Sequence, residues 1–191
     1  EMMWQLYWVA VDMQNMETPI TFTDIFTPQE LYDLWQVFNF NFFACNSSYA
    51  PAKGYFTANA GNLVRDIVKN ADSYIAAGDH GATLRFGHDG NIIPLTALMQ
   101  LENCYTDETD PAKLASAWTD FKISPMASNL QIVFFKNKDG KVLAKIMLNE
   151  REIALPVETD SFPFYPWEAL RAHLMNCLLY TSPSPRDRTR S

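Results

Sequence analysis

The chain has 191 residues, 48% hydrophobic and 14% aromatic, so it is long enough to bury one substantial core. Its formal net charge of -7 argues against a nucleic-acid surface, which needs clustered lysines and arginines, but a locally basic pocket can still bind a small polyanion. The sequence contains no apolar run near the roughly 20 residues of a membrane span, and its N-terminus shows no signal peptide.

The N-terminal quarter predicts two helices. Residues 2–16, rich in Met, Trp, Tyr and Val, predict a buried helix whose earlier part is missing, with its methionines as core filler. Thr27, Pro28 and Glu30 predict a helix start, because they can act as N-cap, first helical residue and capping-box partner. Apolar residues follow at helical spacing and predict a core-facing stripe: Leu31, Leu34, Trp35 and Phe38.

From Asn39 to Asn59 the sequence predicts a long loop, since Pro51 and Gly54 interrupt it. Lys53 on this loop is a candidate phosphate contact, and a solvated lysine is the alternative. An amphipathic helix is expected next, with its apolar face formed by Leu63, Val64, Ile67, Val68, Ala71 and Ile75, and with Arg65, Asp66, Lys69 and Asp72 on its wet face.

The central stretch, Ala82 to Leu101, predicts a short strand, a turn bracketed by glycines, and an apolar helix. Leu84 and Phe86 are the apolar strand positions. Gly87 and Gly90 allow the backbone to bend tightly between the strand and the helix.

The turn itself contains His88 and Asp89, with Asn91 as the expected helix cap and Pro94 in the expected first turn. The positive end of a helix dipole and its unpaired N–H groups can bind an anion, and phosphate is the natural candidate. From spacing alone, a His-Asp pair in a turn is more often a local hydrogen-bonded structure than a catalytic pair.

The region from Asn103 to Ser128 predicts an irregular stretch containing one short helix, which Asp110 caps and Pro111 opens. Asp107 and Glu108 lie next to this cap. They lack the regular alternation and the glycine of a calcium-binding EF-hand loop, so a solvated acidic loop is expected.

A β-hairpin is predicted from residues 130–136 and 141–148, because two apolar, β-branched and aromatic runs are joined by Asn-Lys-Asp-Gly at 137–140. Residues 151–155 are expected to add a short edge strand.

After a loop over residues 160–167, a last helix is expected from about Trp167 to Met175, with His173 on it as a surface or half-buried residue. Residues 177–191 lose apolar periodicity and become rich in Ser, Pro and Arg, which predicts a disordered tail that is not native to the protein. The alternative is a basic tail for an acidic partner.

The cysteines, Cys45, Cys104 and Cys177, lack the paired spacing of a metal site. The alternatives are a Cys45–Cys104 disulfide, if the protein is exported, and free buried thiols.

Two strings in this sequence carry a resemblance to a known family. Leu-Arg-Phe-Gly-His-Asp-Gly at 84–90, followed by Ile-Ile-Pro-Leu, resembles the second signature of the histidine phosphatase superfamily, in the branch of the histidine acid phosphatases and phytases. Met-Ala-Ser-Asn-Leu at 126–130 and Met-Leu-Asn-Glu at 147–150 resemble the C-terminal part of the multiple inositol polyphosphate phosphatases. The resemblance covers most of residues 20–172.

This resemblance implies hydrolysis of phosphomonoesters, inositol polyphosphates such as phytate among them, through a phosphohistidine intermediate. His88 corresponds to the second histidine of the phosphate pocket, and Asp89 to the acid that protonates the leaving oxygen. Arg85 alternates with Leu84 and Phe86, which indicates a structural ion pair. No metal or other cofactor is implied. A broad-specificity acid phosphatase and a non-catalytic phosphate-binding relative are the alternatives.

The first signature of the family, Arg-His-Gly-x-Arg-x-Pro, holds the nucleophile and is absent from this sequence. The nearest string, residues 79–85, has Asp and Thr in place of the two arginines and lacks the proline, so His80 is expected to be a solvated loop residue. The chain therefore resembles a C-terminal fragment that is inactive alone. The family resemblance also implies export to a periplasmic, extracellular or lumenal space.

The expected fold is α/β. Residues 1–80 would form the C-terminal portion of a helical subdomain, residues 81–176 the C-terminal portion of a histidine-phosphatase-like α/β core, and residues 177–191 the tail. The oligomeric state stays open.

Overall fold

The computed structural model describes residues 1–78 and 80–180. Its helices are α1 (Met2–Asp12), α2 (Pro28–Asn46), α3 (Gly61–Ala77), α4 (Asp89–Leu98), α5 (Pro111–Ala117), α6 (Asp120–Ile123) and α7 (Trp167–Tyr180), with 3₁₀ turns at Met13–Asn15, Thr23–Ile25, Ala50–Ala52 and Thr57–Ala60. Its strands are β1 (Leu130–Lys136), β2 (Val142–Leu148), β3 (Arg151–Glu152) and β4 (Phe164–Pro166).

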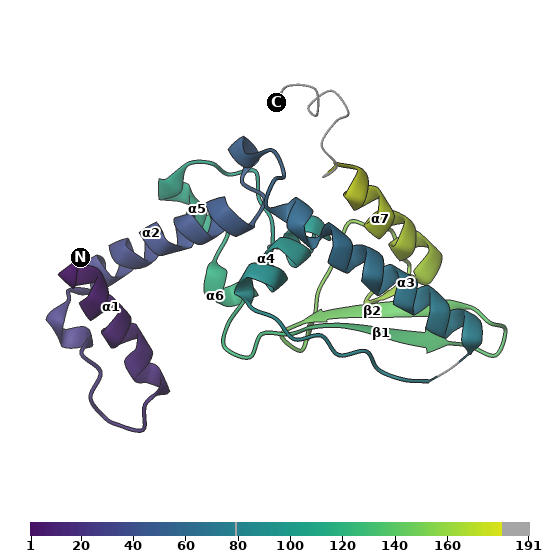
Figure 1. Ribbon diagram of the computed structural model, residues 1–191, viewed down its shortest axis with the longest axis horizontal. Helices are drawn as coiled ribbons and strands as arrows, with labels where there is room; N and C mark the ends of the chain where they lie inside the picture. Colours follow the sequence, from purple (N-terminus) through teal and green to yellow (C-terminus); the bar gives the residue numbers. More distant parts are fainter. Residues whose placement is uncertain (79, 181–191) are drawn as a thin grey trace.

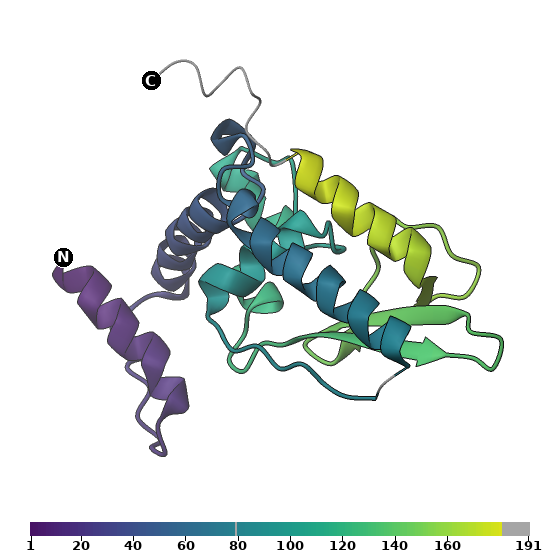
Figure 2. The same ribbon diagram turned by 45° about the vertical axis from the view of Figure 1, so that its right-hand side comes forward.

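The described strands form one antiparallel sheet, and helices α3 and α7 lie side by side over it (Figures 1 and 2). Strand β1 pairs with β2 from Leu130↔Leu148 to Lys136↔Val142, which confirms the predicted hairpin. Strands β3 and β4 both pair with the other edge of β2. Helices packed on a sheet confirm the predicted α/β class.

The turn of the hairpin forms as its sequence indicates. The Oδ1 atom of Asn137 accepts a hydrogen bond of 2.8 Å from the backbone N–H of Lys141. Gly140 has φ +81°, a left-handed conformation that favours glycine because it has no Cβ.

Helix α1 stands apart from the sheet at the N-terminal end of the molecule (Figure 1). Met2, Met3 and Met16 are 72%, 53% and 61% exposed, and the buried residues of the helix are Tyr7 and Ala10. The prediction of a buried helix with core methionines is therefore wrong in this structure, because the helix packs along one side only, against α2.

Helix α2 begins as predicted. The Oγ1 atom of Thr27 accepts a hydrogen bond of 3.2 Å from the N–H of Glu30, and Glu30 Oε2 accepts one of 2.7 Å from the N–H of Thr27. This reciprocal capping box satisfies two N–H groups that the helix itself leaves unpaired.

The predicted loop from Asn39 is wrong at its start, because α2 continues to Asn46. The buried Asn39 side chain donates to Trp118 O at 3.1 Å and accepts from Asp120 N at 2.8 Å, and Phe43 is fully buried. These tertiary contacts stabilise helical turns that the polar and aromatic composition did not indicate.

Helix α7 also exceeds its predicted length and ends at Tyr180. Cys177 and Leu178 are buried, so the predicted boundary of the tail at residue 177 is wrong. The rest of that predicted tail, residues 181–191, lies outside the described residues. Strand β4 and helix α6 are further elements that the sequence did not indicate.

The buried core contains residues from both predicted parts of the chain, among them Val64 and Val68 of α3, Ile146 of β2 and Leu170 of α7. Across the α3–α7 contact, Asp72 Oδ2 accepts from Arg171 Nε at 2.9 Å. The division into a helical subdomain and an α/β core stays a prediction. Within residues 1–78 and 80–180, no helix has the length and apolar character needed to cross a membrane.

Candidate functional site

His88 and Asp89 lie together at the N-terminus of α4, His88 as the N-cap and Asp89 as the first helical residue, and both are exposed. The carbonyl of His88 accepts hydrogen bonds from the N–H groups of Asn91 and Ile92 at 2.9 and 3.1 Å. The His-Asp pair is therefore part of the first helical turn, in which the N–H groups of Gly90, Asn91 and Ile92 are hydrogen-bonded within the turn itself.

Asn91 is the third helical residue and not the predicted N-cap. Its Oδ1 atom accepts a hydrogen bond of 3.0 Å from the backbone N–H of His88, so it caps the turn from inside the helix. Because the helix begins earlier than predicted, Pro94 lies beyond the first turn, inside α4. The ring removes one hydrogen bond to the preceding turn.

Gly87 has a steric role in this turn. A Cβ atom added there would lie 2.9 Å from Asn91 Oδ1, too close for an unbonded carbon and oxygen. A residue without a side chain is thus required if Asn91 is to reach the N–H of His88.

The body of α4 is firmly anchored, although its first turn is exposed. Ile93 and Thr96 are fully buried, and the 3₁₀ turn Thr57–Ala60 packs against the helix. At the other end, His173 Nε2 lies 3.0 Å from the carbonyl oxygen of Met99. Functional groups on such an anchored element keep a defined position.

The segment that leads into the turn, residues 80–88, is not the predicted strand. Leu84 and Phe86 are 76% and 94% exposed, and this segment pairs with no described strand. It runs beside the free edge of β1 in both ribbon views (Figures 1 and 2). Its backbone lacks the regular hydrogen bonds that define a strand.

Arg85 confirms its predicted structural ion pair. Its Nε atom donates to Asp66 Oδ2 at 3.0 Å, and its Nη2 atom binds the same oxygen. The hydrogen bond from Arg85 is the main cause that lowers the pKa of Asp66 from its usual value. The sequence placed Asp66 only on a wet helix face, and no local signal identified it as the partner of a residue in the motif.

The other sequence candidates lie in solvent or serve local structure. Lys53 and His80 are exposed, which fits the solvated alternative for each. Glu108 Oε1 accepts from the N–H of Asp110 at 2.9 Å, and Asp110 Oδ1 accepts from the N–H of Ala112 at 3.0 Å. These carboxylates therefore order a loop and a helix start. Among the described residues, no group of three or more His, Cys, Asp or Glu side chains is arranged to hold a metal ion.

The cysteines are free thiols in this structure, with Cys45 exposed and Cys104 and Cys177 buried. Burial raises the pKa of Cys104 to about 12. Cys177 Sγ lies 3.5 Å from His173 Nε2, a contact between half-buried or buried side chains that the sequence did not indicate.

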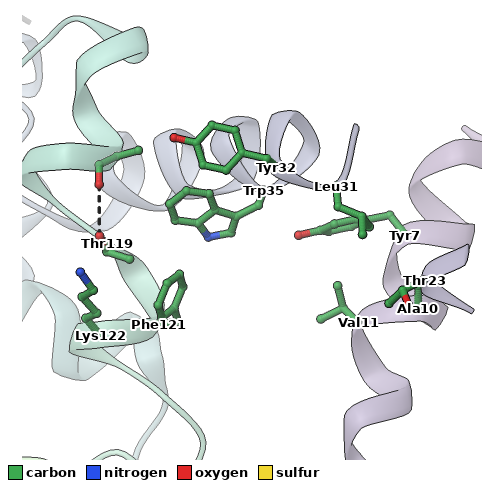
Figure 3. A pocket seen from close by; sticks show the side chains of 11 residues that line it. Tyr7, Ala10, Val11, Thr23, Leu31, Tyr32, Trp35, Thr119, Phe121 and Lys122 are labelled. Atoms are coloured by element: carbon green, nitrogen blue, oxygen red, sulfur yellow. Dashed lines mark hydrogen bonds between the residues drawn. The ribbon is translucent and has the colours of Figure 1, made fainter. Parts of the chain in front are cut away.

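A cavity of about 540 Å³ lies between α1, α2 and α6 (Figure 3), and neither His88 nor Asp89 lines it. Its walls are mainly aromatic and aliphatic. Trp35, which lines it, donates from Nε1 to Asp120 Oδ1 at 3.0 Å. Tyr7 lines it from α1, and burial, together with the charge of Asp120, raises the pKa of this tyrosine.

The sequence model for the histidine phosphatase superfamily (branch 2) matches residues 1–149. The matched region includes the His88–Asp89 turn, all of α4, and the β1–β2 hairpin. Comparison with curated proteins found no match.

Proposed function

Since the chain belongs to the histidine phosphatase superfamily (branch 2), whose chemistry is of the phosphatase type, we propose that it is part of a histidine acid phosphatase close to the multiple inositol polyphosphate phosphatases. The observation that supports this most is the exposed His88–Asp89 pair at the start of an anchored helix, inside the matched region. The proposed substrates are inositol polyphosphates, phytate among them, and simpler phosphomonoesters are the second candidate.

In the proposed mechanism, His88 donates a hydrogen bond to an oxygen of the phosphoryl group. Its imidazole is exposed at the N-cap of α4, where the positive end of the helix dipole also favours an anion. The phosphoryl oxygens share the charge that develops during transfer, so a donor fixed at this position stabilises the transition state.

Asp89 is the proposed proton donor to the leaving oxygen. Its Oδ1 atom accepts a hydrogen bond of 2.7 Å from the N–H of Gly90, which holds the carboxyl group against the helix start. The Oδ2 atom makes no hydrogen bond within the described part of the chain and can carry the proton. A bound phosphate favours the protonated, neutral form of a neighbouring carboxyl group.

The nucleophilic histidine is not part of this sequence, which lacks Arg-His-Gly-x-Arg-x-Pro. The proposed enzyme therefore needs that motif from residues outside this chain, and the chain alone is expected to be inactive. Export to a periplasmic, extracellular or lumenal space is part of the proposal through the family resemblance.

The same missing nucleophile favours one alternative, a relative that binds phosphate without turnover. Its distinguishing property is a complete gene without the nucleophile motif. An in-frame Arg-His-Gly-x-Arg-x-Pro upstream of residue 1 supports the enzyme instead.

The test compares leaving groups in the enzyme that includes the nucleophile motif. An inositol alkoxide needs a proton to leave, whereas p-nitrophenolate leaves readily without one. Asp89→Asn should therefore lower kcat for phytate by roughly 10²- to 10⁴-fold, the usual contribution of a positioned general acid, and lower kcat for p-nitrophenyl phosphate far less. His88→Ala should lower both, because both substrates carry the phosphoryl group.

Asp107→Asn is the matched control, since Asp107 is an exposed carboxylate on the acidic loop. It should leave both kcat values unchanged. Equal losses on the two substrates for Asp89→Asn would remove Asp89 as the proton donor. Turnover of phytate by the purified 191-residue chain would contradict its assignment as an incomplete enzyme.

A further inference from the structure

The residues that lead into the His-Asp turn are held in an unusual way. The backbone of residues 80–87 makes no hydrogen bond with other described residues, and the segment pairs with no described strand. The hydrogen bonds and ion pair that join this segment to the rest of the described protein come from the side chain of Arg85. Arg85 is therefore the residue that ties this segment to the described protein by hydrogen bonds.

That contact has a well-supported acceptor. Asp66 Oδ2 accepts from both Nε and Nη2 of Arg85, while Asp66 Oδ1 accepts from Asn70 Nδ2 at 2.9 Å. Asp66 lies on α3, where the neighbouring residues Val64 and Val68 are 1% and 3% exposed. The carboxylate is thus fixed on a helix packed into the core, and the planar guanidinium restricts how Arg85 can bind it.

The distance along the chain from this contact to the proposed site is short. Extended backbone from Arg85 to His88 spans about 10 Å. His88 is therefore held from two sides, upstream by the Arg85–Asp66 pair and downstream by α4 through the Asn91 side chain.

We propose that the Arg85–Asp66 ion pair is a positioning contact that holds the lead-in of the His88–Asp89 turn against helix α3. This inference rests on the proposed function for its effect on catalysis, whereas its structural part is independent of that function. The side chains of Arg85 and Asp66 are 31% and 53% exposed, and exposed ion pairs contribute little to global stability. The pair should thus act locally on the turn.

The structural test uses the 191-residue chain and hydrogen exchange, measured by mass spectrometry on peptides spanning residues 86–93. This region includes the N–H groups of His88, Asn91 and Ile92, which are hydrogen-bonded in the turn. Arg85→Met and Asp66→Asn should each accelerate this exchange about two- to five-fold, the range that an exposed ion pair provides. Hydrogen exchange in the double variant Arg85→Met/Asp66→Asn should be no faster than in either single variant.

Arg65→Met is the matched control, because it makes the same change of charge on α3. Arg65 Nη1 bonds only to Asn62 Oδ1, at 3.0 Å, among the described residues. The control should leave the exchange unchanged. Swapping the two charged residues, in the double variant Arg85→Asp/Asp66→Arg, should restore slow hydrogen exchange in residues 86–93. The proposal would be overturned if Arg85→Met left hydrogen exchange unchanged or if the control accelerated it equally. Additive accelerations in the double variant would also overturn it. If Arg85→Met fails to fold, Arg85→Lys gives the same comparison, with a smaller acceleration.

The catalytic part is tested in the enzyme that includes the nucleophile motif. Arg85→Met should lower kcat for both phytate and p-nitrophenyl phosphate by up to about five-fold, the limit that an exposed ion pair sets, with a smaller change in KM. The variant in which the two residues are swapped should recover kcat. Faster exchange with unchanged kcat would overturn the positioning role. Equal losses on the two substrates for Asp89→Asn, with the hydrogen-exchange result intact, would remove Asp89 as the proton donor and leave the structural contact established.

Discussion

The turn that carries His88 and Asp89 depends on a close contact between Gly87 and Asn91, and the substitution Gly87→Ala tests it. A methyl group at Gly87 would lie 2.9 Å from Asn91 Oδ1 and 3.3 Å from its Cγ. The Asn91 side chain is exposed and can rotate away, but it then loses its 3.0 Å hydrogen bond from the N–H of His88. The substitution should therefore remove this bond without disturbing the core.

The expected magnitude has two opposing parts. Loss of a capping hydrogen bond at an exposed helix start lowers the free energy of unfolding by about 0.5–1 kcal/mol. Gly87 is not among the glycines with positive φ, so alanine also restricts the unfolded chain and raises that free energy by about 0.4–1 kcal/mol. Gly87→Ala should then be nearly neutral.

The decisive quantity is the coupling between the two residues. Asn91→Ala removes the same hydrogen bond, so the double variant Gly87→Ala/Asn91→Ala has no further bond to lose and no steric clash. Its stability should differ from the sum of the single changes by about 0.5–1 kcal/mol, in the stabilising direction. The higher helix propensity of alanine at position 91 enters both variants that contain it and cancels.

Urea unfolding of the four proteins, followed by circular dichroism, measures this double-mutant cycle. The contact is refuted if the two single effects add within the error of the experiment, or if Gly87→Ala alone destabilises the protein by several kcal/mol. The latter result would mean that the backbone and not the Asn91 side chain absorbs the methyl group.

Two further predictions concern thiol reactivity and helix capping. At pH 8 in the native state, a thiol reagent should label the exposed Cys45 rapidly and should label Cys104 and Cys177 only after unfolding. The reagent reacts with thiolates, and burial disfavours the thiolate by raising the pKa of Cys177 and that of Cys104, the latter to about 12. Fast labelling of all the thiols in the native protein would contradict this. Thr27→Ala should lower the free energy of unfolding by about 1 kcal/mol, because the N–H of Glu30 loses its acceptor. Thr27→Ser keeps the hydroxyl group and should have nearly the stability of the wild type. Equal losses of stability for the two variants in urea unfolding would exclude the capping role.

The elements that the sequence predicts well are those with local chemical signals. Thr27 and Glu30 lie three positions apart, the turn at 137–140 joins neighbouring strands, and α3 repeats its apolar residues at helical spacing. In each case the interacting groups are close along the chain, so their pattern is visible without knowledge of the fold. The family motif located the His88–Asp89 turn in the same way.

The errors arise where distant residues decide the structure. Asn39 is buried in α2 because Trp118 and Asp120 provide its hydrogen-bond partners from much later in the chain. Leu84 and Phe86 alternate like strand residues, but no strand within residues 1–78 and 80–180 pairs with them, and they are exposed. A strand pattern becomes a strand only where another segment supplies the matching hydrogen bonds.

At the candidate site, too, local features could be predicted and long-range contacts could not. The sequence was sufficient to place His88 and Asp89 together where an apolar helix begins, because helix capping is a local property, whereas the expected turn before the helix is wrong since Asp89 and Gly90 already belong to α4. The partner of Arg85 follows from the packing of the chain, since its ion pair with Asp66 on α3 joins two segments whose distance in space depends on how α3 packs against the core.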